Sequence, residues 1–516
     1  MNAIMSATHI LTILALLPLV GSILIGLVRP LRKHAAVLGL VFSGATFVLA
    51  LWALSQFDMS QGSAIQLGEY ATWIPALGVS WALGVNALGL AMILLATFIV
   101  PLVLLASRDE IDEDKHAGFT ALVLSLEFFM VLIFAARDVF LFYVVFEAML
   151  IPVYFLIGRY GGDNRRAAAL KFLLYSLAGG LIMLGGIVGL YVYGPGGETA
   201  FLIDSLVGNI DASAGAMNLM FVCFMIAFAI KAPMVPVHTW LPDTAEQATP
   251  GTSVLLIGIL DKVGTFGMIT LCLPLFTDSV SSARTVILVL ALISIIYGGL
   301  TAIGQDHLYR LISYTSISHF GFMVLGIFIG SQIAAVGAMV YMVAHGLSIA
   351  GLFLVTGFLA QRTGTLKISE MGGMQRVTPL IAGTFLISGL ASIALPGLSG
   401  FVPEWMVLTG TFSVCTACGI IAVFGVVIAA LYVMLPYQRV FTGAPTAERM
   451  NDADLNIREK VVLIPVIAAM FLLGFLPGAL VNVLNPIGEQ IHSATTVETA
   501  TSAQATVTTA LEGSVK

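Results

Sequence analysis

Ionisable side chains stand inside stretches of this sequence that are otherwise apolar and as long as a membrane span. A charge at the centre of a bilayer costs about 2.5–3.5 kcal/mol on insertion scales, so such residues point to function. Burial favours the neutral forms of acids and bases, and histidine titrates near neutral pH without much tuning. Together these residue types predict a proton relay. Its candidate residues are Glu147, Lys231, Lys262, His319, His345 and Glu404, with Glu127, His238 and Asp261 as secondary candidates.

A structural role remains open for each of these residues taken alone. A single histidine on a helix is more often a packing residue, and opposite charges can form a neutralised pair that only joins helices. The hydroxyl groups from Ser313 to Ser318, beside His319, could hold water inside the bundle or could simply pack helices together. Several acids alternate with lysines along the chain, and this repetition favours the relay.

Lys231 lies where an apolar helix must break. Pro233 and Pro236 follow it within five residues. A proline removes a backbone donor and clashes with the preceding turn. Interrupted backbone persists inside a membrane only where protein surrounds it or a wet cavity borders it. The pattern predicts an internal ion path at Lys231, and a second break at Leu395-Pro396-Gly397 precedes Glu404 in the same way.

The composition is that of an all-α polytopic membrane protein. The chain has 516 residues, of which 59% are hydrophobic and 10% charged, and its mean hydropathy is +1.02. A spanning helix needs about 20 apolar residues. About fourteen such stretches are predicted, at 9–28, 36–56, 84–105, 118–135, 139–157, 168–193, 217–239, 251–272, 285–303, 308–329, 332–359, 380–413, 415–441 and 461–482. From about Asn485 onward the Ser-, Thr- and Ala-rich sequence predicts a disordered tail.

Basic residues predict the orientation of these spans. With the N-terminus outside, most of the 22 lysines and arginines fall in loops on the inner side, as the positive-inside rule requires. Both termini are therefore predicted to face outside. No basic residue precedes the first apolar run, so it is not interpreted as a cleavable signal.

The two interrupted spans, the seventh and the twelfth, lie five spans apart. An odd offset inverts orientation, so spans 4–8 and 9–13 are predicted to form two inverted five-helix repeats with a transport site at the breaks. The predicted parts are N-terminal helices (1–114), a first repeat (115–272), a second repeat (273–441), a last helix (442–484) and a polar tail (485–516).

Motifs for other chemistry are absent from the sequence. It contains no phosphate loop, dinucleotide fingerprint or nucleophile triad. Cys415 and Cys418 form a C-x-x-C pair without a second pair or a neighbouring histidine, and we interpret them as small packing residues rather than as a disulfide or a metal site. The chain therefore needs a partner or an existing ion gradient to drive it.

Four stretches carry a resemblance to a known family over about residues 85 to 480. They are Asp138 to Pro152, Lys231 to Asp243, Leu311 to Gly321, and Leu395 to Glu404. In these the chain resembles the antiporter-like membrane subunits of respiratory complex I and of multi-subunit sodium/proton antiporters. A glutamate after the Leu-Pro-Gly break is similar to the subunit M branch of bacterial complex I, equivalent to mitochondrial chain 4, whereas sibling subunits typically carry lysine there.

The resemblance implies a role for each residue. Glu147 would gate Lys231, the proton-carrying lysine of the broken helix. Lys262 would lie on a central axis continued by the two histidines, and Glu404 would be the exit-side carboxylate. It also implies a translocase subunit without redox chemistry of its own. Flavin, iron–sulfur clusters and quinone would belong to other subunits, and the partners would be sibling membrane subunits in the cell's inner (plasma) membrane, with no nucleic acid.

The sequence departs from the family pattern in places. Asp261 replaces a usual leucine beside Lys262, and it could pair with that lysine or face another helix. The segment Thr244 to Thr249 lacks a usual histidine and has its glutamate displaced. Asn86 stands where aspartate is common, which we interpret as structural. Three alternatives stay open: a subunit of a cation/proton antiporter or membrane hydrogenase, a non-conducting membrane scaffold, and a stand-alone transporter.

Overall fold

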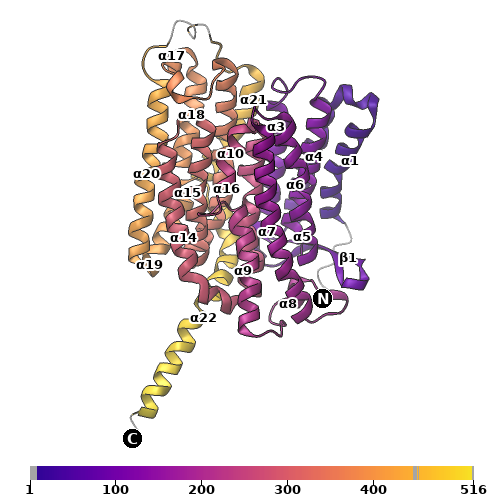
Figure 1. The fold of residues 1–516 in the computed structure, drawn as a ribbon, viewed down its shortest axis with the longest axis vertical. Helices are drawn as coiled ribbons and strands as arrows, with labels where there is room; N and C mark the ends of the chain where they lie inside the picture. Colours follow the sequence, from indigo (N-terminus) through magenta and orange to yellow (C-terminus); the bar gives the residue numbers. More distant parts are fainter. Residues whose placement is uncertain (1–8, 446–449, 451, 514–516) are drawn as a thin grey trace.

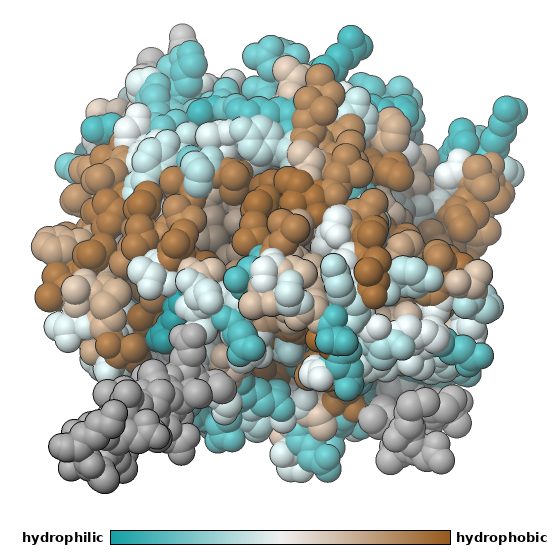
Figure 2. All heavy atoms as spheres, turned by 60° about the horizontal axis from the view of Figure 1, so that its bottom comes forward, coloured by the Kyte–Doolittle hydropathy of each residue, from teal (hydrophilic) through white to brown (hydrophobic). Residues whose placement is uncertain are grey.

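The chain folds into a bundle whose long helices run roughly side by side (Figure 1). The computed structural model describes residues 9–445, 450 and 452–513, and side chains as far as Thr496. Within that part of the chain, twelve helices are long and apolar enough to cross a membrane. An apolar band separates polar regions on the outer surface (Figure 2). The predicted all-α polytopic fold is confirmed.

The first half of the bundle ends at the broken helix. Its helices are α1 (Ile10–Leu27), α2 (Ala35–Gln56), α3 (Ala87–Ala106), α4 (His116–Ala135), α5 (Val139–Ala148), α6 (Leu150–Tyr160), α7 (Arg165–Tyr193), the short α8 (Ile203–Leu206) and α9 (Ala214–Lys231). Because α6 follows α5 with a single residue between them, the two together make one span.

The second half contains the most buried spans. Its helices are α10 (Trp240–Gln247), α11 (Pro250–Leu255), α12 (Lys262–Gly267), α13 (Leu273–Leu275), α14 (Thr277–Ile303), α15 (Leu308–Phe328), α16 (Gln332–Thr363), α17 (Met374–Val377), α18 (Pro379–Ser392), α19 (Phe401–Val414), α20 (Thr416–Phe441), α21 (Ile457–Phe475) and α22 (Gly478–Gly513). The α11–α13 span, α15 and α16 are 94%, 100% and 94% buried over their most apolar windows. These three form the centre of the molecule.

Both predicted breaks are present. The α9 helix ends at Lys231 ahead of Pro233, and Trp240 Nε1 donates a hydrogen bond of 3.0 Å to the freed carbonyl of Ile230. The second break separates α18 from α19, and there Gly397 has φ of 89°, a conformation that favours glycine. All fourteen predicted stretches contain helix. Twelve span alone, α21 and α22 form a pair bent by 65°, and the broken twelfth consists of α18 and α19.

The span from Pro250 to Leu275 is irregular in a way that the sequence did not predict. Two π-helical segments, Leu256–Leu260 and Met268–Cys272, lie on either side of α12. A π turn inserts one extra residue and rotates the side chains that follow, and such turns are frequent at functional sites. Here the first π turn ends directly before Asp261.

A β-hairpin that was not predicted lies against the start of α1. β1 (Gln66–Ile74) pairs antiparallel with β2 (Val79–Val85). Glu69 of β1 accepts a hydrogen bond of 2.7 Å from Leu11 N, so the hairpin caps the positive end of α1. Asn86 caps α3 through its Oδ1 atom at 3.0 Å, which confirms its structural interpretation.

The prediction of a disordered tail from Asn485 is wrong for the described residues, since α22 continues to Gly513. Buried Leu484, Ile487 and Ile491 recur at helical spacing and form an apolar stripe. This stripe packs the first part of α22 against α16, and the helix then extends away from the bundle (Figure 1). The sequence around these three residues is rich in Ser, Thr and Ala, so their helical spacing was not recognised.

The interpretation of Cys415 and Cys418 as separate packing residues is also wrong. They form a disulfide, with their Cα atoms 5.3 Å apart. Cys415 is the N-cap of α20 and Cys418 lies in the first turn, so the start of the helix brings the two sulfurs together. Cys223 and Cys272 are free thiols.

Candidate functional site

Lys231 sits buried at the point where α9 stops. Its Nζ atom has no hydrogen-bond partner among the described residues, and it lies 5.6 Å from the ring centroids of both Phe146 and Phe172. Aromatic faces attract a cation but satisfy none of its N–H donors. The Lys231 ammonium is therefore buried beside aromatic faces without a hydrogen-bond acceptor in the described part of the chain.

Glu147 comes from α5 and is only half-buried. No ion pair joins it directly to Lys231 in the described part of the chain, although the two charges act on each other. Its Oε1 atom has no hydrogen-bond partner there and lies against Gly180 of α7, where any Cβ atom would overlap it. Gly180 thus makes the space in which this carboxylate stands between two helices.

Lys262 starts the central polar axis. It is completely buried, and its Nζ atom lies 2.7 Å from both the carbonyl oxygen of Ile257 and the Nδ1 atom of His345. Ile257 belongs to the π turn, and it accepts the bond from five residues further along the chain. The predicted alignment of Lys262 with His345 is therefore a direct hydrogen bond between α12 and α16.

The axis continues through the two histidines. The rings of His345 and His319 stand 5.1 Å apart between centroids, on α16 and α15. The Nε2 atom of His319 is hydrogen-bonded to the Tyr432 hydroxyl on α20 at 2.9 Å. The histidines therefore link the lysine side of the axis to a tyrosine that sequence analysis did not single out.

Glu404 closes the axis on α19, directly after the second break. It is buried, and its Oε2 atom accepts a hydrogen bond of 2.8 Å from the Tyr341 hydroxyl. The Tyr341 ring is also 5.8 Å from the ring of His319. A sequence signal for Tyr341 existed, because it precedes His345 by four residues and therefore shares its helix face.

The secondary candidates Glu127 and His238 are isolated from this axis. Glu127 of α4 is completely buried, and neither of its carboxyl oxygens has a described hydrogen-bond partner. Both ring nitrogens of His238, in the first break, are equally unpartnered among described groups, and its ring packs edge-on against Tyr297 at 5.1 Å. The structure places both in the protein interior without joining them to Lys262.

The hydroxyl groups beside His319 bond to backbone carbonyls. Ser313 donates to Arg310, Ser316 donates to Ile312, and Ser318 donates across to Ile295 of α14 at 2.9 Å. Small residues with such bonds let two helices approach closely. This geometry favours the packing interpretation over the water-holding one.

Charged residues fix the α10 end of the first break. Asp243 accepts hydrogen bonds from Lys171 of α7 at 2.5 Å and from Arg310 of α15 at 2.7 Å, and Glu246 also accepts from Arg310. Burial raises the pKa of Asp243, but the two cationic donors outweigh it and hold that pKa below its usual range. The displaced glutamate noted in the sequence thus joins a network that anchors the broken helix to both halves of the bundle.

Lys262, His345, His319 and Glu404 thus form a continuous buried series of ionisable groups on four helices, α12, α16, α15 and α19. A family model described as "NADH:quinone oxidoreductase/Mrp antiporter, TM" matches residues 136–429, more than half of the chain. The chain belongs to this family. The match takes in the residues from Glu147 to Glu404 that form the axis, and it leaves Glu127 and Tyr432 outside.

Curated relatives place this antiporter-family chain more narrowly. NADH-quinone oxidoreductase subunit M of Mycobacterium tuberculosis (strain ATCC 25618 / H37Rv) is 41% identical, and the alignment covers 93% of each chain. Subunit M of Escherichia coli (strain K12) is 35% identical over 89% of this chain and 91% of that protein. The expected resemblance to the subunit M branch is confirmed.

Solved structures agree with the fold. A chain of "Respiratory complex I from Thermus thermophilus with bound NADH" superposes with a TM-score of 0.86 at 31% identity, over 94% of this chain and 99% of that one. A chain of the Mrp complex from Dietzia sp. DQ12-45-1b superposes with a TM-score of 0.84 at 19% identity, which shows the shared fold alone.

We expect the stability of this antiporter-family chain to depend on pH because of Glu110, in the loop between α3 and α4. Burial among Pro250, Leu354 and Phe358 raises its pKa to about 8. The folded chain therefore holds this proton more tightly than the unfolded chain does. The stabilisation is complete below about pH 4.5 and is lost as the pH rises to about 8, by an amount on the order of 2–4 kcal/mol.

Glu110→Gln is expected to remove that decline, since a neutral amide fills the same site without titrating. Thermal unfolding of the purified protein at a series of pH values measures the effect. The exposed Glu113→Gln variant serves as the control and should keep the wild-type profile. If the wild-type protein became more stable relative to Glu110→Gln between pH 5 and pH 8, the raised pKa of Glu110 would be contradicted.

Proposed function

We propose that the chain is the proton-translocating membrane subunit of an NADH:quinone oxidoreductase, driven by electron transfer in other subunits. The observation that carries the proposal is the buried axis from Lys262 through His345 and His319 to Glu404, whose members meet end to end across four helices. Ionisable groups are costly inside a membrane, so a connected series of them favours a path for charge. The similarity to NADH-quinone oxidoreductase subunit M of two bacteria supports the choice of complex.

The six main candidate residues receive roles at the first break or along this axis. Lys231 carries a proton at the first break, and Glu147 modulates its charge from α5. Lys262 passes the proton to the histidines, and Glu404 delivers it toward the exit at the second break. The similar position of the two breaks supports the proposed inverted repeats, 115–272 and 273–441, flanked by the N-terminal helices, the last helix and the tail.

Partners and cofactors follow from the same proposal. Among the described residues, no group of three or more His, Cys, Asp or Glu side chains lies close enough to hold a metal ion. Flavin, iron–sulfur clusters and quinone are assigned to companion subunits. The chain would contact those membrane subunits, including sibling antiporter-like ones, and the lipid bilayer.

The disulfide supports the proposed orientation. With both termini outside, the turn between α19 and α20 also faces outside, and this turn carries Cys415 and Cys418. Disulfides form and persist in oxidising compartments such as the bacterial exterior. We therefore place the chain in the cell's inner (plasma) membrane, with most of its basic loops on the inner side.

A cation/proton antiporter subunit is the second candidate, because the description of the matching family model also names the Mrp antiporter. Purification of the tagged chain in mild detergent separates the two. Under our proposal the companions reduce quinone with NADH, and reconstituted vesicles build a proton gradient. Sodium-driven proton exchange by companions that do not react with NADH would favour the antiporter, and transport by the chain alone would favour a stand-alone carrier.

The two tyrosines of the axis give a further prediction. Tyr432→Phe and Tyr341→Phe each keep the ring but remove the hydroxyl that touches His319 or Glu404. Each variant is expected to assemble normally and to lower NADH-driven proton pumping by about tenfold, since a positioned acid–base group is lost. Pumping by reconstituted complex is the measurement, and the exposed Tyr193→Phe variant is the control. Unchanged pumping in both variants would remove the tyrosines from the path.

A further inference from the structure

We propose that Asp261 is a proton-carrying group that links Lys231 to Lys262. This inference rests on the proposed function, and it assigns a role to a residue that the family resemblance leaves without one. In place of a single acid, Glu147, it gives Lys231 two acids, one from α5 and one from the start of α12.

Asp261 is a completely buried carboxyl group without a described hydrogen-bond partner. Its exposed fraction is 0%, and neither Oδ1 nor Oδ2 is bonded to any described group. An acid in such a position is costly unless opposite charges face it or it carries a proton. A residue serving only to fill space between helices gains nothing from a carboxyl group.

The packing of α12 directs Asp261 toward the end of α9. Gly264 follows Asp261 by three residues and so shares its helix face. A Cβ atom on Gly264 would press on the backbone of Phe228 and Ala232, which lie on either side of Lys231. Asp261 therefore belongs to the surface by which α12 meets the last turn of α9.

The charges agree with this placement. Among the charged groups acting on Lys231, Asp261 acts more strongly than Glu147 does. In the same way, the charge of Lys231 acts more strongly on Asp261 than does the charge of Lys262, its neighbour in sequence. The Lys262 ammonium is instead hydrogen-bonded to His345 and to the carbonyl oxygen of Ile257. The π turn that ends at Asp261 allows two adjacent residues to serve two different helices.

No hydrogen bond joins Lys231 to Asp261 in the described part of the chain, so a transfer requires the two side chains to move within hydrogen-bond distance of each other. Once they do, the arrangement supports a balanced pair of proton transfers. In the first, an N–H bond of the Lys231 ammonium breaks and an O–H bond forms on the Asp261 carboxylate, which leaves a neutral amine and a neutral acid. In the second, that O–H bond breaks and an N–H bond forms on the neutral amine of Lys262, which restores the carboxylate. The new ammonium then stands at hydrogen-bond distance from His345.

Asp261→Asn tests the inference in the intact complex, because the amide keeps the shape of the side chain and cannot accept the proton. We expect normal assembly, measured by the amount of intact complex on native gels and by NADH oxidation with a soluble acceptor. NADH-driven proton pumping should fall by about tenfold or more. Asp261→Glu, which restores the acid, should recover most of it, and this recovery separates proton carrying from a merely structural role.

Two comparisons keep the outcomes distinct. Asp278→Asn, an exposed acid at the start of α14, is the matched control and should pump normally. If Asp261→Asn pumps normally while Lys231→Met does not, the inference about Asp261 falls and the proposed function stands. If both pump normally, the proposed function falls as well. Should Asp261→Asn fail to assemble, Asp261→Leu fills the same space without a polar group, and pumping by an assembled Leu variant at the wild-type rate would equally overturn the inference.

Discussion

Lys231→Met is expected to leave the complex assembled and to lower NADH-driven proton pumping by about a hundredfold or more, the range of a lost acid–base group. Methionine preserves the unbranched stem that packs between Phe146 and Phe172 but removes the ammonium. The described contacts of Nζ include no hydrogen bond, so the substitution breaks none. The fold should therefore keep about its wild-type stability.

Pumping by reconstituted complex, compared with its thermal stability, measures both parts of this result. A scaffold would show the opposite pattern, with unchanged pumping and a stability that depends on the lysine. Lys171→Met is a matched control, since this lysine forms an ion pair with Asp243 and lies partly exposed. Its loss should weaken the anchor of α10 and leave the proton path in place. Equal pumping by Lys231→Met and wild type would contradict the relay.

The sequence predicted the lysines and acids of the site because a charge within an apolar stretch is visible without any structure. It did not identify the tyrosines, since a phenol is only weakly polar and occurs in many membrane helices that conduct nothing. Tyr432 and His319 lie 113 residues apart, and only the packing of α20 on α15 joins them. The direct bond between Lys262 and His345 arises in the same way.

Backbone irregularity separates what could be predicted from what could not. Prolines mark the breaks after Lys231 and before Glu404, because they remove a backbone donor wherever they stand. The π turns beside Asp261 contain no such marker, since tertiary packing rather than residue type produces them. The hairpin was not predicted for a related reason. It occupies the connection between two helices, α2 and α3, and the prediction of membrane spans treated that connection as a loop.

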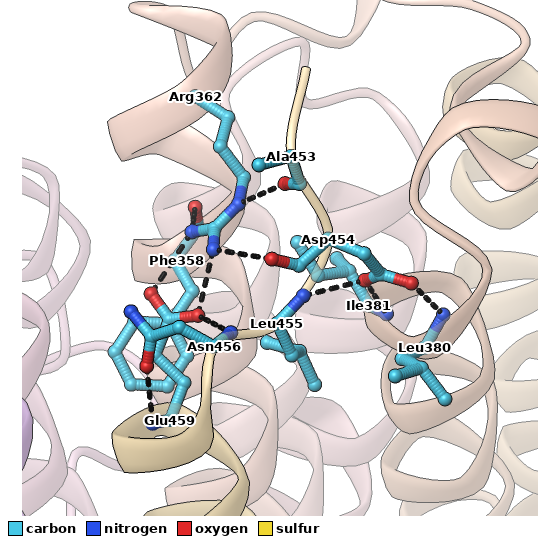
Figure 3. A network of polar contacts seen from close by, with 9 residues as sticks. All are labelled: Phe358, Arg362, Leu380, Ile381, Ala453, Asp454, Leu455, Asn456 and Glu459. Atoms are coloured by element: carbon cyan, nitrogen blue, oxygen red, sulfur yellow. Dashed lines mark hydrogen bonds and ion pairs between the residues drawn. The ribbon is translucent and has the colours of Figure 1, made fainter. Parts of the chain in front are cut away.

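Glu459→Ala is expected to destabilise the chain by about 3–5 kcal/mol, the cost of leaving one charge of a buried pair uncompensated. Glu459, at the start of α21, is 1% exposed and receives two hydrogen bonds from the guanidinium of Arg362 at the end of α16, at 3.0 and 2.6 Å (Figure 3). Arg362 also donates to the carbonyls of Ala453 and Asp454. The pair therefore holds the loop before α21 against the central helix.

The same carboxylate caps its own helix. Its Oε2 atom accepts from the backbone N–H of Asn456, while Asn456 Oδ1 accepts from Glu459 N, both at 2.9 Å (Figure 3). Alanine removes this capping box along with the ion pair, so the loss should reach the upper part of the range. The temperature at which the purified complex unfolds measures it.

A double variant distinguishes a broken pair from a general loss of packing. Arg362→Leu combined with Glu459→Leu removes both charges at once, so it should be markedly more stable than Glu459→Ala, in which the largely buried arginine loses its counter-charge. The exposed pair of Lys367 and Glu370 provides the control, and Glu370→Ala should not change the unfolding temperature measurably. If the double variant were as unstable as Glu459→Ala, the uncompensated charge would not be the cause, and the attachment of α21 to α16 would have to depend on apolar contacts such as those of the buried Val462 and Val466.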